Sequence, residues 1–456
     1  MIVSMIVVFV LCYVLIATEH KVNINKSATA LFLGTLLWIL YSYSLDSSTK
    51  GDFLNENLLE HVADITEIVL FLLGAMTVVE IIDRHGGFNF VSRCITTTNK
   101  KKLLWAVSLI TFFLSAALDN LTTAIVMIMV LRKLMAPSNE RWMFASMVIL
   151  SANAGGAFSP IGDVTTIMLW INGNISALAS VKHLFLPSLA SIVVPLLILS
   201  IKMHGQVLPA NSVDKEEIPV SITRKERIEI FIIGVGGLLL VPIFREVTSL
   251  PPFMGILSVV SLLWLYTEIL YGQRKDLEES EKRRVAKIVR HLDFPTIFFF
   301  FGILLAVSAL QEAGILVSMS HFLDEKFHNI YLITGSIGVL SSVVDNVPLV
   351  AAAMGMYPIH TPDTINAAVQ AVSVDPNIIA NTADYLNNFA LDGSFWQLLA
   401  YCAGVGGSIL IIGSAAGVVI MGLEKMTFGW YFKNISGIAL LGYLSGILIY
   451  FLQQLI

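Results

Sequence analysis

Long apolar stretches constrain the fold of this chain more than any other feature of its sequence. Residues 2–17, 28–43, 65–82, 228–244, 253–271 and 294–316 are each apolar over about the length that crosses a hydrocarbon core of roughly 30 Å. Only 13% of the residues are charged, whereas soluble domains carry roughly 25%. These observations exclude a water-soluble fold, and we predict an all-α polytopic membrane protein with about ten full spans.

The cysteines and the first apolar stretch exclude two further interpretations. Cys12, Cys94 and Cys402 lie far apart and form no CxxC pair, so the sequence predicts neither a disulfide framework nor a thiolate metal site. No Lys or Arg precedes Lys21, so the first stretch lacks the basic region of a cleavable signal peptide and is expected to remain as the first helix. We expect no cofactor and no nucleic-acid partner, and the lipid bilayer surrounds the chain.

The two halves of the chain contain the same three blocks in the same order, which indicates an internal repeat. Residues 72–87 resemble 300–314, residues 115–127 resemble 341–354, and residues 151–166 resemble 402–417. The second and third blocks are further apart in the second half. The polar stretch 358–394 accounts for this difference as an inserted outer loop.

A polar Asp-Asn corner lies inside each of the segments 102–135 and 330–357. Each segment is either two full spans or a re-entrant hairpin that enters and leaves on one face. If both segments are hairpins and the N-terminus lies outside, all but four of the 28 Lys and Arg residues fall in cytoplasmic segments. Cytoplasmic segments of membrane proteins carry an excess of Lys and Arg, so this count favours the hairpins. The exceptions are Lys50, Lys182, Arg245 and Lys326. An odd number of full spans then precedes the second repeat, so the repeats have inverted topology and both termini lie outside.

Glycine-rich corners interrupt the helix that follows each hairpin, which predicts two broken helices. Breaking a helix frees backbone carbonyls and amides that bind ions at mid-bilayer. The predicted organisation is a first repeat at 1–203, with hairpin 102–135 and broken helix 142–171; a cytoplasmic linker at 204–227; and a second repeat at 228–456, with cytoplasmic loop 272–291, hairpin 330–357, outer loop 358–394 and broken helix 395–421.

Oxygen-bearing side chains gather at the two hairpin tips and the two helix breaks. The candidate cation- and proton-binding residues are Asp119, Asn120, Thr122, Thr123, Asn153, Asp163, Thr165, Thr166, Ser341, Asp345, Asn346, Ser408 and Ser414. Such oxygens replace the water around a small hard cation, and we place Na⁺ at Asp119 and Asp163. An anion site would instead need cations, and no Lys or Arg lies in these blocks. Glu67 and Glu80, on the third span, form a second tier of candidates.

Structural roles also account for several of these residues. Asp163, like Ser414 in the second repeat, is placed to cap the second half of a broken helix. Asp119 and Asp345 are ordinary residue types at polar turns, and Asn153 could hydrogen-bond only the broken backbone. Capping and ion binding are compatible, so the sequence leaves both roles open for Asp163.

The motifs at these positions resemble a known family over nearly the whole chain. Residues 119–123 read DNLTT, residues 151–166 read SANAGGAFSPIGDVTT, and residues 341–348 read SSVVDNVP. The pattern resembles the NhaD-type sodium/proton antiporters of the ion transporter superfamily, which also contains arsenite permeases and sodium/dicarboxylate carriers. Ser-Asn-Thr motifs occupy the tips in the dicarboxylate carriers, so Asp119 and Asp345 point to the antiporter branch. The resemblance implies export of Na⁺ or Li⁺ coupled to H⁺ entry in a prokaryotic plasma (inner) membrane.

The mechanism that we expect is alternating access, in which the hairpins and broken helices move against the outer helices. Na⁺ and H⁺ compete for the same carboxylates, because a bound cation favours the ionised form and protonation expels the cation. An arsenite or organic-anion permease of the same superfamily is the first alternative. A cation channel is another alternative. It would be distinguished by cation currents that no opposing proton gradient can drive uphill.

An alternative from a different class is an intramembrane aspartyl protease, with a dyad drawn from Asp119, Asp163 and Asp345. It is disfavoured, because the GxGD motif of that family is absent before Asp163. We therefore expect a secondary transporter and not an enzyme. A homodimer is compatible with the sequence.

Overall fold

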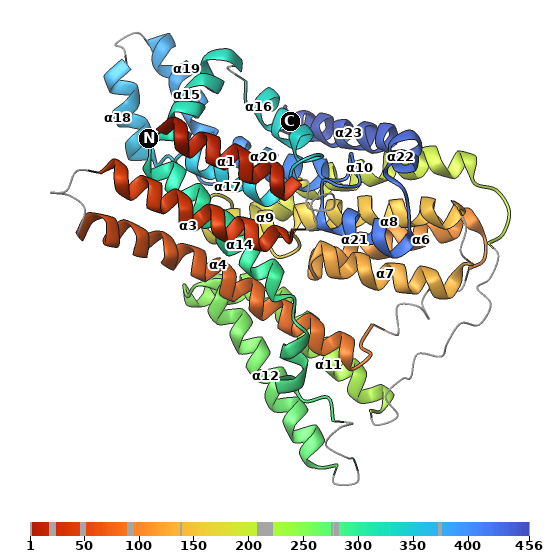
Figure 1. Ribbon diagram of the computed structural model, residues 1–456. Helices are drawn as coiled ribbons and strands as arrows, with labels where there is room; N and C mark the ends of the chain where they lie inside the picture. Colours follow the sequence, from red (N-terminus) through yellow and green to blue (C-terminus); the bar gives the residue numbers. More distant parts are fainter. Residues whose placement is uncertain are drawn as a thin grey trace.

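A computed structural model describes residues 2–17, 24–45, 52–88, 95, 97–136, 139–207, 222–274, 277, 282–327, 329–372 and 376–455. Within these ranges every regular element is helical, and β pairing is limited to two isolated bridges. The predicted all-α class is therefore confirmed (Figure 1).

Seven helical segments in the described part of the chain are long and apolar enough to cross a membrane, so the chain is a multi-pass membrane protein. They are α3 (Lys26–Ser44), α4 (Asp52–Arg84), α10 (Ala177–Lys202), α11 (Arg224–Thr248), α12 (Pro252–Gly272), α14 (Phe294–Glu312) and the continuous run of α22 (Phe428–Tyr431), a π-helical turn (Phe432–Ser436) and α23 (Gly437–Gln454). The expected number of about ten spans also counted α1 (Ile2–Ala17), which is shorter, and two interrupted helices.

Short helices meet at four junctions, which coincide with the polar corners of the sequence. The junctions are α6 (Lys100–Ala117) with α7 (Asn120–Leu134), α8 (Asn139–Phe158) with α9 (Val164–Ile171), α16 (Ile330–Leu340) with α17 (Asn346–Met356), and α20 (Ser394–Gly406) with α21 (Ala415–Glu424). Each second helix begins after a polar N-cap whose side chain accepts a backbone N–H: Asp119, Asp163, Asp345 and Ser414. Asp163 and Ser414 therefore have the capping role that the sequence left open, and Asp119 and Asp345 cap helices as well.

Matched glycines let helices cross at backbone contact in both halves. A Cβ atom added to Gly155 of α8 would lie 2.1 Å from the carbonyl oxygen of Phe112 in α6. A Cβ atom added to Gly406 of α20 would lie 2.1 Å from the carbonyl oxygen of Gly338 in α16. Gly155 and Gly406 occupy matching positions of the third sequence block. The same close helix crossing therefore occurs twice in the molecule.

Matched serines add the same hydrogen bond in each half. Ser115, near the end of α6, donates its hydroxyl to the carbonyl oxygen of Ala152 in α8 at 2.6 Å. Ser341, which follows α16, donates to the carbonyl oxygen of Ala403 in α20 at 2.8 Å. The serines match in the second sequence block and the alanines in the third. Each bond holds a helix junction against its neighbouring interrupted helix.

Substituting Gly155 with alanine is expected to destabilise the protein, because the added methyl group forces α6 and α8 apart. Overpacking of this kind costs about 1–3 kcal/mol. Gly236→Ala in α11 is the matched control, because no atom lies within 4 Å of a Cβ added there. The melting temperature of the purified protein in detergent compares the two variants. Equal melting temperatures would contradict the tight crossing at Gly155.

Two sets of helices pack against each other, and we name them the outer group and the junction group. The outer group contains α3, α4, α11, α12 and α14, with α3 packed along α14 and α4 along α12. The junction group contains α6–α9, α16, α17, α20 and α21, with α8 packed against α6, α7, α20 and α21. The two groups touch where α14 packs on α17 and where α4 packs on α9.

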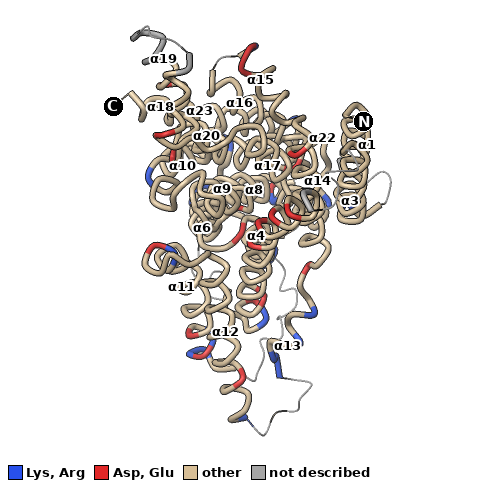
Figure 2. The backbone as a smooth tube through the Cα atoms, turned by 90° about the vertical axis from the view of Figure 1, so that its left-hand side faces the viewer, with Lys and Arg blue, Asp and Glu red and all other residues tan. Residues whose placement is uncertain are grey.

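Basic residues gather where α4, α11, α12 and the short helix α13 (Val285–Ile288) come together (Figure 2). Arg274, after α12, lies 2.7 Å from Glu226 in the first turn of α11. Arg283, before α13, donates to the backbone carbonyl of Arg84 at the end of α4. We call this region, defined by Arg84, Arg274 and Arg283, the basic end. Both termini lie in the upper half of Figure 2, away from it.

The predicted outer loop 358–394 is not a simple loop. It contains two helices, α18 (Pro362–Val372) and α19 (Pro376–Asn387). Each begins with a proline at the first helical position, where proline is favoured, so the sequence did contain the signal. The span expected at 294–316 is also shorter, since α14 ends at Glu312 and α15 (Ile315–Phe327) follows.

Two predicted cytoplasmic segments are only partly described. The linker 204–227 includes residues 208–221, and the loop 272–291 includes residues 275–276 and 278–281, all of which lie outside the described residues.

Candidate functional site

Asp163 lies at the centre of a hydrogen-bond network that joins several junctions. It is 1% exposed. Its Oδ1 accepts from the backbone N–H and the hydroxyl of Thr165, each at 2.9 Å. Its Oδ2 accepts from Asn120 Nδ2 at 2.6 Å, and Asn346 Nδ2 lies 3.4 Å from both carboxylate oxygens. The carboxylate is therefore a buried acceptor surrounded by donors from α7, α9 and α17.

Asn153 links this carboxylate to the break between α20 and α21. Its Oδ1 accepts from Asn120 Nδ2 at 3.2 Å. Its Nδ2 donates to the hydroxyls of Ser408 and Ser414 at 2.8 and 2.9 Å. These bonds go to side chains and not only to the broken backbone, which was the alternative for Asn153. Side chains from all four junctions are thus brought together around two adjacent polar groups.

Asp119 stands beside this network, with its carboxylate held by its own helix. Its Oδ1 accepts from the backbone N–H of Thr122 at 2.8 Å, and its Oδ2 accepts from the Thr122 hydroxyl at 2.6 Å. Asp119 is only partly buried, and both Asp119 and Asp163 line a cavity of about 280 Å³. It therefore caps α7 and also presents a carboxylate to the cavity.

A lysine that the motifs did not indicate lies at the site. Lys26 Nζ, on the first residue of α3, lies 3.5 Å from Asp345 Oδ2. It also lies 4.5 Å from the centroid of the Phe299 ring. The site therefore includes a basic residue that the sequence blocks do not contain. The sequence blocks contained no signal, because Lys26 and Asp345 are 319 residues apart in the chain.

Several hydroxyl candidates do not line this cavity. Thr166 donates to the carbonyl oxygen of Ala157 at 3.4 Å, and Ser341 makes the packing contact described above. The Thr123 hydroxyl is buried and has no hydrogen-bond partner among the described residues. Ser341 therefore contributes to helix packing, and the Thr123 hydroxyl is buried outside the cavity lining.

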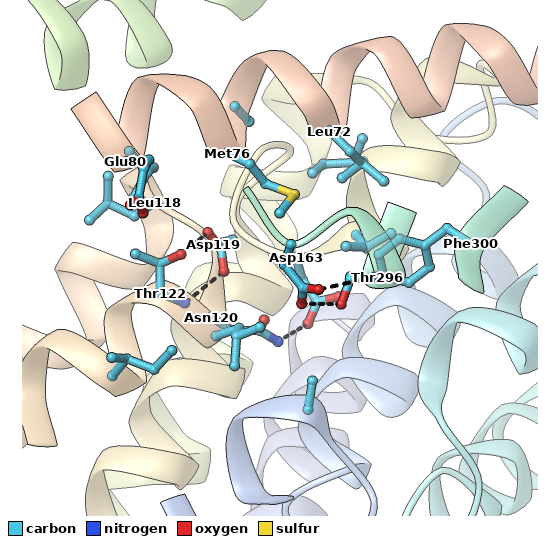
Figure 3. A pocket seen from close by; sticks show the side chains of 18 of the residues that line it. Leu72, Met76, Glu80, Leu118, Asp119, Asn120, Thr122, Asp163, Thr296 and Phe300 are labelled. Carbon is cyan, nitrogen blue, oxygen red and sulfur yellow. Dashed lines mark hydrogen bonds between the residues drawn. The ribbon is translucent and has the colours of Figure 1, made fainter. Parts of the chain in front are cut away.

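A cavity of about 280 Å³ extends from the ends of α3, α4 and α14 to these carboxylates, and we call it the site cavity. The predicted site residues that line it are Asp119, Asn120, Thr122, Asp163, Asp345, Asn346 and Ser414. Figure 3 shows Asp119, Asn120 and Asp163 facing Leu72 and Met76 of α4. The wall therefore combines the junction group with the outer group.

The two second-tier carboxylates lie in different places. Glu80 lines the site cavity and accepts from Arg84 Nε at 2.7 Å. Glu67 lines a second cavity of about 430 Å³, together with Asp64 and Asn174. This second cavity reaches the C-terminal end of α9, whereas the site cavity reaches its N-terminal end.

A thin layer separates the two cavities. The site cavity extends to Leu72 of α4 and Phe300 of α14, and the second cavity extends to Ile68 and Leu304 of the same helices. These positions are one helical turn apart, which is about 5.4 Å along the axis. None of the tip or break residues lines the second cavity, so the predicted site faces one cavity only.

The helix N-termini at the site face negative charge supplied by the protein. A helix N-terminus carries partial positive charge and favours nearby anions by about 0.3–1 kcal/mol. The caps of α7, α9 and α17 are Asp119, Asp163 and Asp345, so three of the four N-termini already face a carboxylate. An anion in the cavity would therefore lie next to these negative charges.

The available ligands at the site are oxygen atoms. The described residues contain no group of three or more His, Cys, Asp or Glu arranged to hold a metal ion. Carboxylate, amide and hydroxyl oxygens are the ligands of small hard cations. The arrangement offers oxygen ligands of the kind that a small hard cation uses.

Comparisons with known proteins identify relatives along almost the whole chain. The chain matches the family described as citrate transporter over residues 13–383. It is 43% and 42% identical to sodium/proton antiporters 1 and 2 of Arabidopsis thaliana, over 98% of this chain and over 72% and 98% of theirs. It is 29% identical to the Na⁺/H⁺ antiporter NhaD of Vibrio cholerae, over 98% of this chain and 91% of that protein.

Proposed function

The chain belongs to the citrate transporter family of the ion transporter superfamily, with NhaD-type antiporters among its relatives, and we propose that it exchanges Na⁺ or Li⁺ for H⁺ across a membrane. Membership in a transporter family makes it a transporter and not an enzyme. The cargo ions are its substrates, and no cofactor takes part.

The observation that carries this proposal is the buried carboxylate of Asp163 at the inner wall of the site cavity. A buried carboxylate needs a partner for its charge, and either a proton or a cation supplies one. Both ligands use the same oxygen atoms, so binding of one displaces the other. Competition of this kind couples the two ion movements.

The amide groups around Asp163 respond to both ligands in the same way. With Asp163 ionised, Asn120 and Asn346 direct their Nδ2 donors at it. A proton on the carboxylate adds a donor and a cation needs an acceptor, and an amide that turns its oxygen towards the carboxylate serves either ligand. Rotation of Asn120 meets this need and breaks its bond to Asn153. Ligand binding is thereby transmitted to the broken helix α8–α9.

Alternating access follows from movement of the junction group against the outer group. Two features support it: both groups contribute to the wall of the site cavity, and a layer of about one helical turn separates this cavity from the second one. Rocking of one group past the other closes the first cavity and opens the second to the same carboxylates. Glu67 and Asp64 then lie on the second route.

The two halves form inverted repeats, each with one re-entrant hairpin and one broken helix. Gly155 and its counterpart Gly406 make equivalent helix crossings in the two halves, and Ser115 and its counterpart Ser341 make equivalent hydrogen bonds. These matched contacts support this organisation. The first hairpin comprises α6 and α7, and the second comprises α16 and α17. The domain boundaries at 203 and 228 remain predictions.

The site cavity faces the cytoplasm in this state, and both chain termini lie outside. The basic end supports this orientation, because cytoplasmic segments of membrane proteins carry an excess of Lys and Arg. His291 and Asp293, which follow α13 in the chain, line the site cavity. The relatives come from a plant and from bacteria, so a prokaryotic plasma membrane remains the prediction from the motifs alone.

Transport of an organic anion is the second candidate, which the citrate transporter description of the family and the presence of Lys26 both favour. The lining of the site cavity contains one lysine but five aspartates and Glu80, however, and an anion needs net positive surroundings. Cation exchange therefore fits the charge of the cavity better.

Dissipation of a pH gradient in everted membrane vesicles tests the proposed function. Addition of Na⁺ or Li⁺ is expected to dissipate the gradient, and K⁺ is expected to have a smaller effect. Vesicles without the protein are the control for leakage. Gradient-driven citrate uptake, with no response to Na⁺ or Li⁺, would instead establish the anion carrier.

A further inference from the structure

The carboxylates of Asp119 and Asp345 occupy matching positions but have different partners. Both oxygens of Asp119 accept from Thr122. The matching residue in the second half is Pro348, which has neither an N–H nor a hydroxyl. The second oxygen of Asp345 therefore lacks this local donor, and it faces Lys26 Nζ at 3.5 Å.

The position of Lys26 is not explained by the formation of α3. It is the first residue of that helix, where a positive side chain is unfavourable next to the partial positive charge of the N-terminus. Its ammonium group lies over the ring of Phe299 and lines the site cavity, with the Lys26 and Asp345 side chains 29% and 20% exposed. The side chain is therefore directed at the carboxylates.

The backbone that carries Lys26 is fixed to the outer group. The neighbouring Ser27 donates its hydroxyl to the carbonyl oxygen of Pro295 at 2.5 Å, and Trp38 Nε1 donates to the carbonyl oxygen of Leu305 at 3.0 Å. Both acceptors belong to α14. Asp345, in contrast, caps α17 of the junction group. The Lys26–Asp345 contact therefore crosses the interface between the two helix groups.

We propose that Lys26 is a tethered cation that competes with the transported cation for the carboxylate of Asp345. The inference rests on the proposed cation exchange. The ammonium group occupies Asp345 when no cargo cation is present, and a cation that takes this carboxylate displaces it. Displacement also removes a charged contact between the two helix groups. Lys26 is thus a positioning residue that lowers the apparent cation affinity and links cation binding to release of the interface.

A purely structural role for this ion pair is poorly supported by its geometry. A partly exposed pair with a 3.5 Å separation adds little to folding stability. Its effect is therefore expected in ion affinity and not in the amount of folded protein.

The test measures the Na⁺ concentration for half-maximal dissipation of the pH gradient in everted vesicles. Lys26→Gln is expected to lower this Na⁺ concentration about two- to fivefold, because that is the change in affinity that one partly exposed ion pair accounts for. The maximal rate of dissipation is expected to stay nearly unchanged. Lys26→Arg keeps the charge and is expected to stay close to the wild type. Lys202→Gln, at the exposed end of α10, is the matched control and is expected to have no effect.

A double-mutant cycle separates competition at Asp345 from a general effect of charge. In an Asp345→Asn background, Lys26→Gln is expected to leave the apparent Na⁺ affinity unchanged. An equal gain in affinity in both backgrounds would overturn the proposal, as would an unchanged affinity of the single variant. If Asp345→Asn does not transport, the Na⁺-dependent rise in melting temperature of the purified proteins completes the cycle. A wild type without any Na⁺ response would refute the proposed exchange itself.

Discussion

Replacing Asp163 with serine is expected to abolish sodium-driven proton movement, while the protein still folds and reaches the membrane. Serine keeps the cap, as Ser414 shows by capping α21 at the matching position. It has no charge to exchange between proton and cation. Asn120 loses its carboxylate acceptor, which costs on the order of 1–3 kcal/mol and leaves a less stable but folded protein.

Two further substitutions at this position separate charge from shape. Asp163→Asn places an amide among the donors of Asn120, Asn346 and Thr165, so at least one donor faces another donor. It is expected to be inactive and less stable than Asp163→Ser. Asp163→Glu keeps an ionisable carboxylate that is one methylene longer, and it is expected to retain some transport with an altered Na⁺ affinity.

The measurements are pH-gradient dissipation in vesicles, the amount of protein in the membrane and the melting temperature in detergent. Asn99→Ala is the matched control, because it removes the cap of α6 away from the site and costs about 1 kcal/mol. It is expected to lower the melting temperature without loss of transport. Robust exchange by Asp163→Ser would remove Asp163 as the coupling carboxylate and leave Asp119 as the leading candidate.

Replacing Glu424 with glutamine is expected to destabilise the protein more than any other change at an ion pair. The Glu424 side chain is 1% exposed and accepts from Arg132 Nε at 2.8 Å and Arg141 Nε at 2.7 Å. Removing one partner of a buried ion pair costs on the order of 3–5 kcal/mol, because the remaining charge stays uncompensated. Arg132 is 40% exposed, so the lower end of this range applies.

This ion triad joins three helices of the junction group. Arg132 lies in the last turn of α7, Arg141 near the start of α8 and Glu424 at the end of α21. Trp142 Nε1 also donates to the carbonyl oxygen of Glu424 at 3.0 Å. The triad therefore ties together helices from both halves of the chain.

Glu140→Gln is the matched control for Glu424→Gln, because Glu140 pairs with Lys100 at a 54% exposed position. Exposed pairs contribute about 0–1 kcal/mol, so the control is expected to melt close to the wild type. The melting temperature and the fraction of monodisperse protein in detergent compare the variants. A melting temperature of Glu424→Gln equal to that of the control would show that the triad does not stabilise the fold.

The polar core of the site could be predicted because its signals are local. Glycines that permit close helix crossing and Asp or Ser residues that cap the next half-helix stand next to each other in the chain. Asp163 and Asn153 were therefore placed at one site from motifs alone, and the structure gives them a shared partner in Asn120. The repeat then indicated where the second set of residues lies.

Other features could not be predicted because they depend on contacts between distant segments. Lys26 enters the site only because α3 packs along α14 and places its first residue beside Asp345. The hydroxyl of Ser341 donates to the carbonyl oxygen of Ala403, a contact between segments 62 residues apart that its place in the sequence block does not specify. A side chain's residue type does not specify which of several nearby partners it contacts.

The sequence by itself determined the membrane-embedded helical class, the four helix junctions and the oxygen-rich character of the site, because burial in lipid and helix capping depend on short stretches of chain. Only the tertiary structure decided which carboxylates are buried, which cavity they face and which cation stands beside them. These properties follow from the packing of the outer group on the junction group. Packing of this kind depends on the shapes of many side chains at once, and no local pattern of residues encodes it.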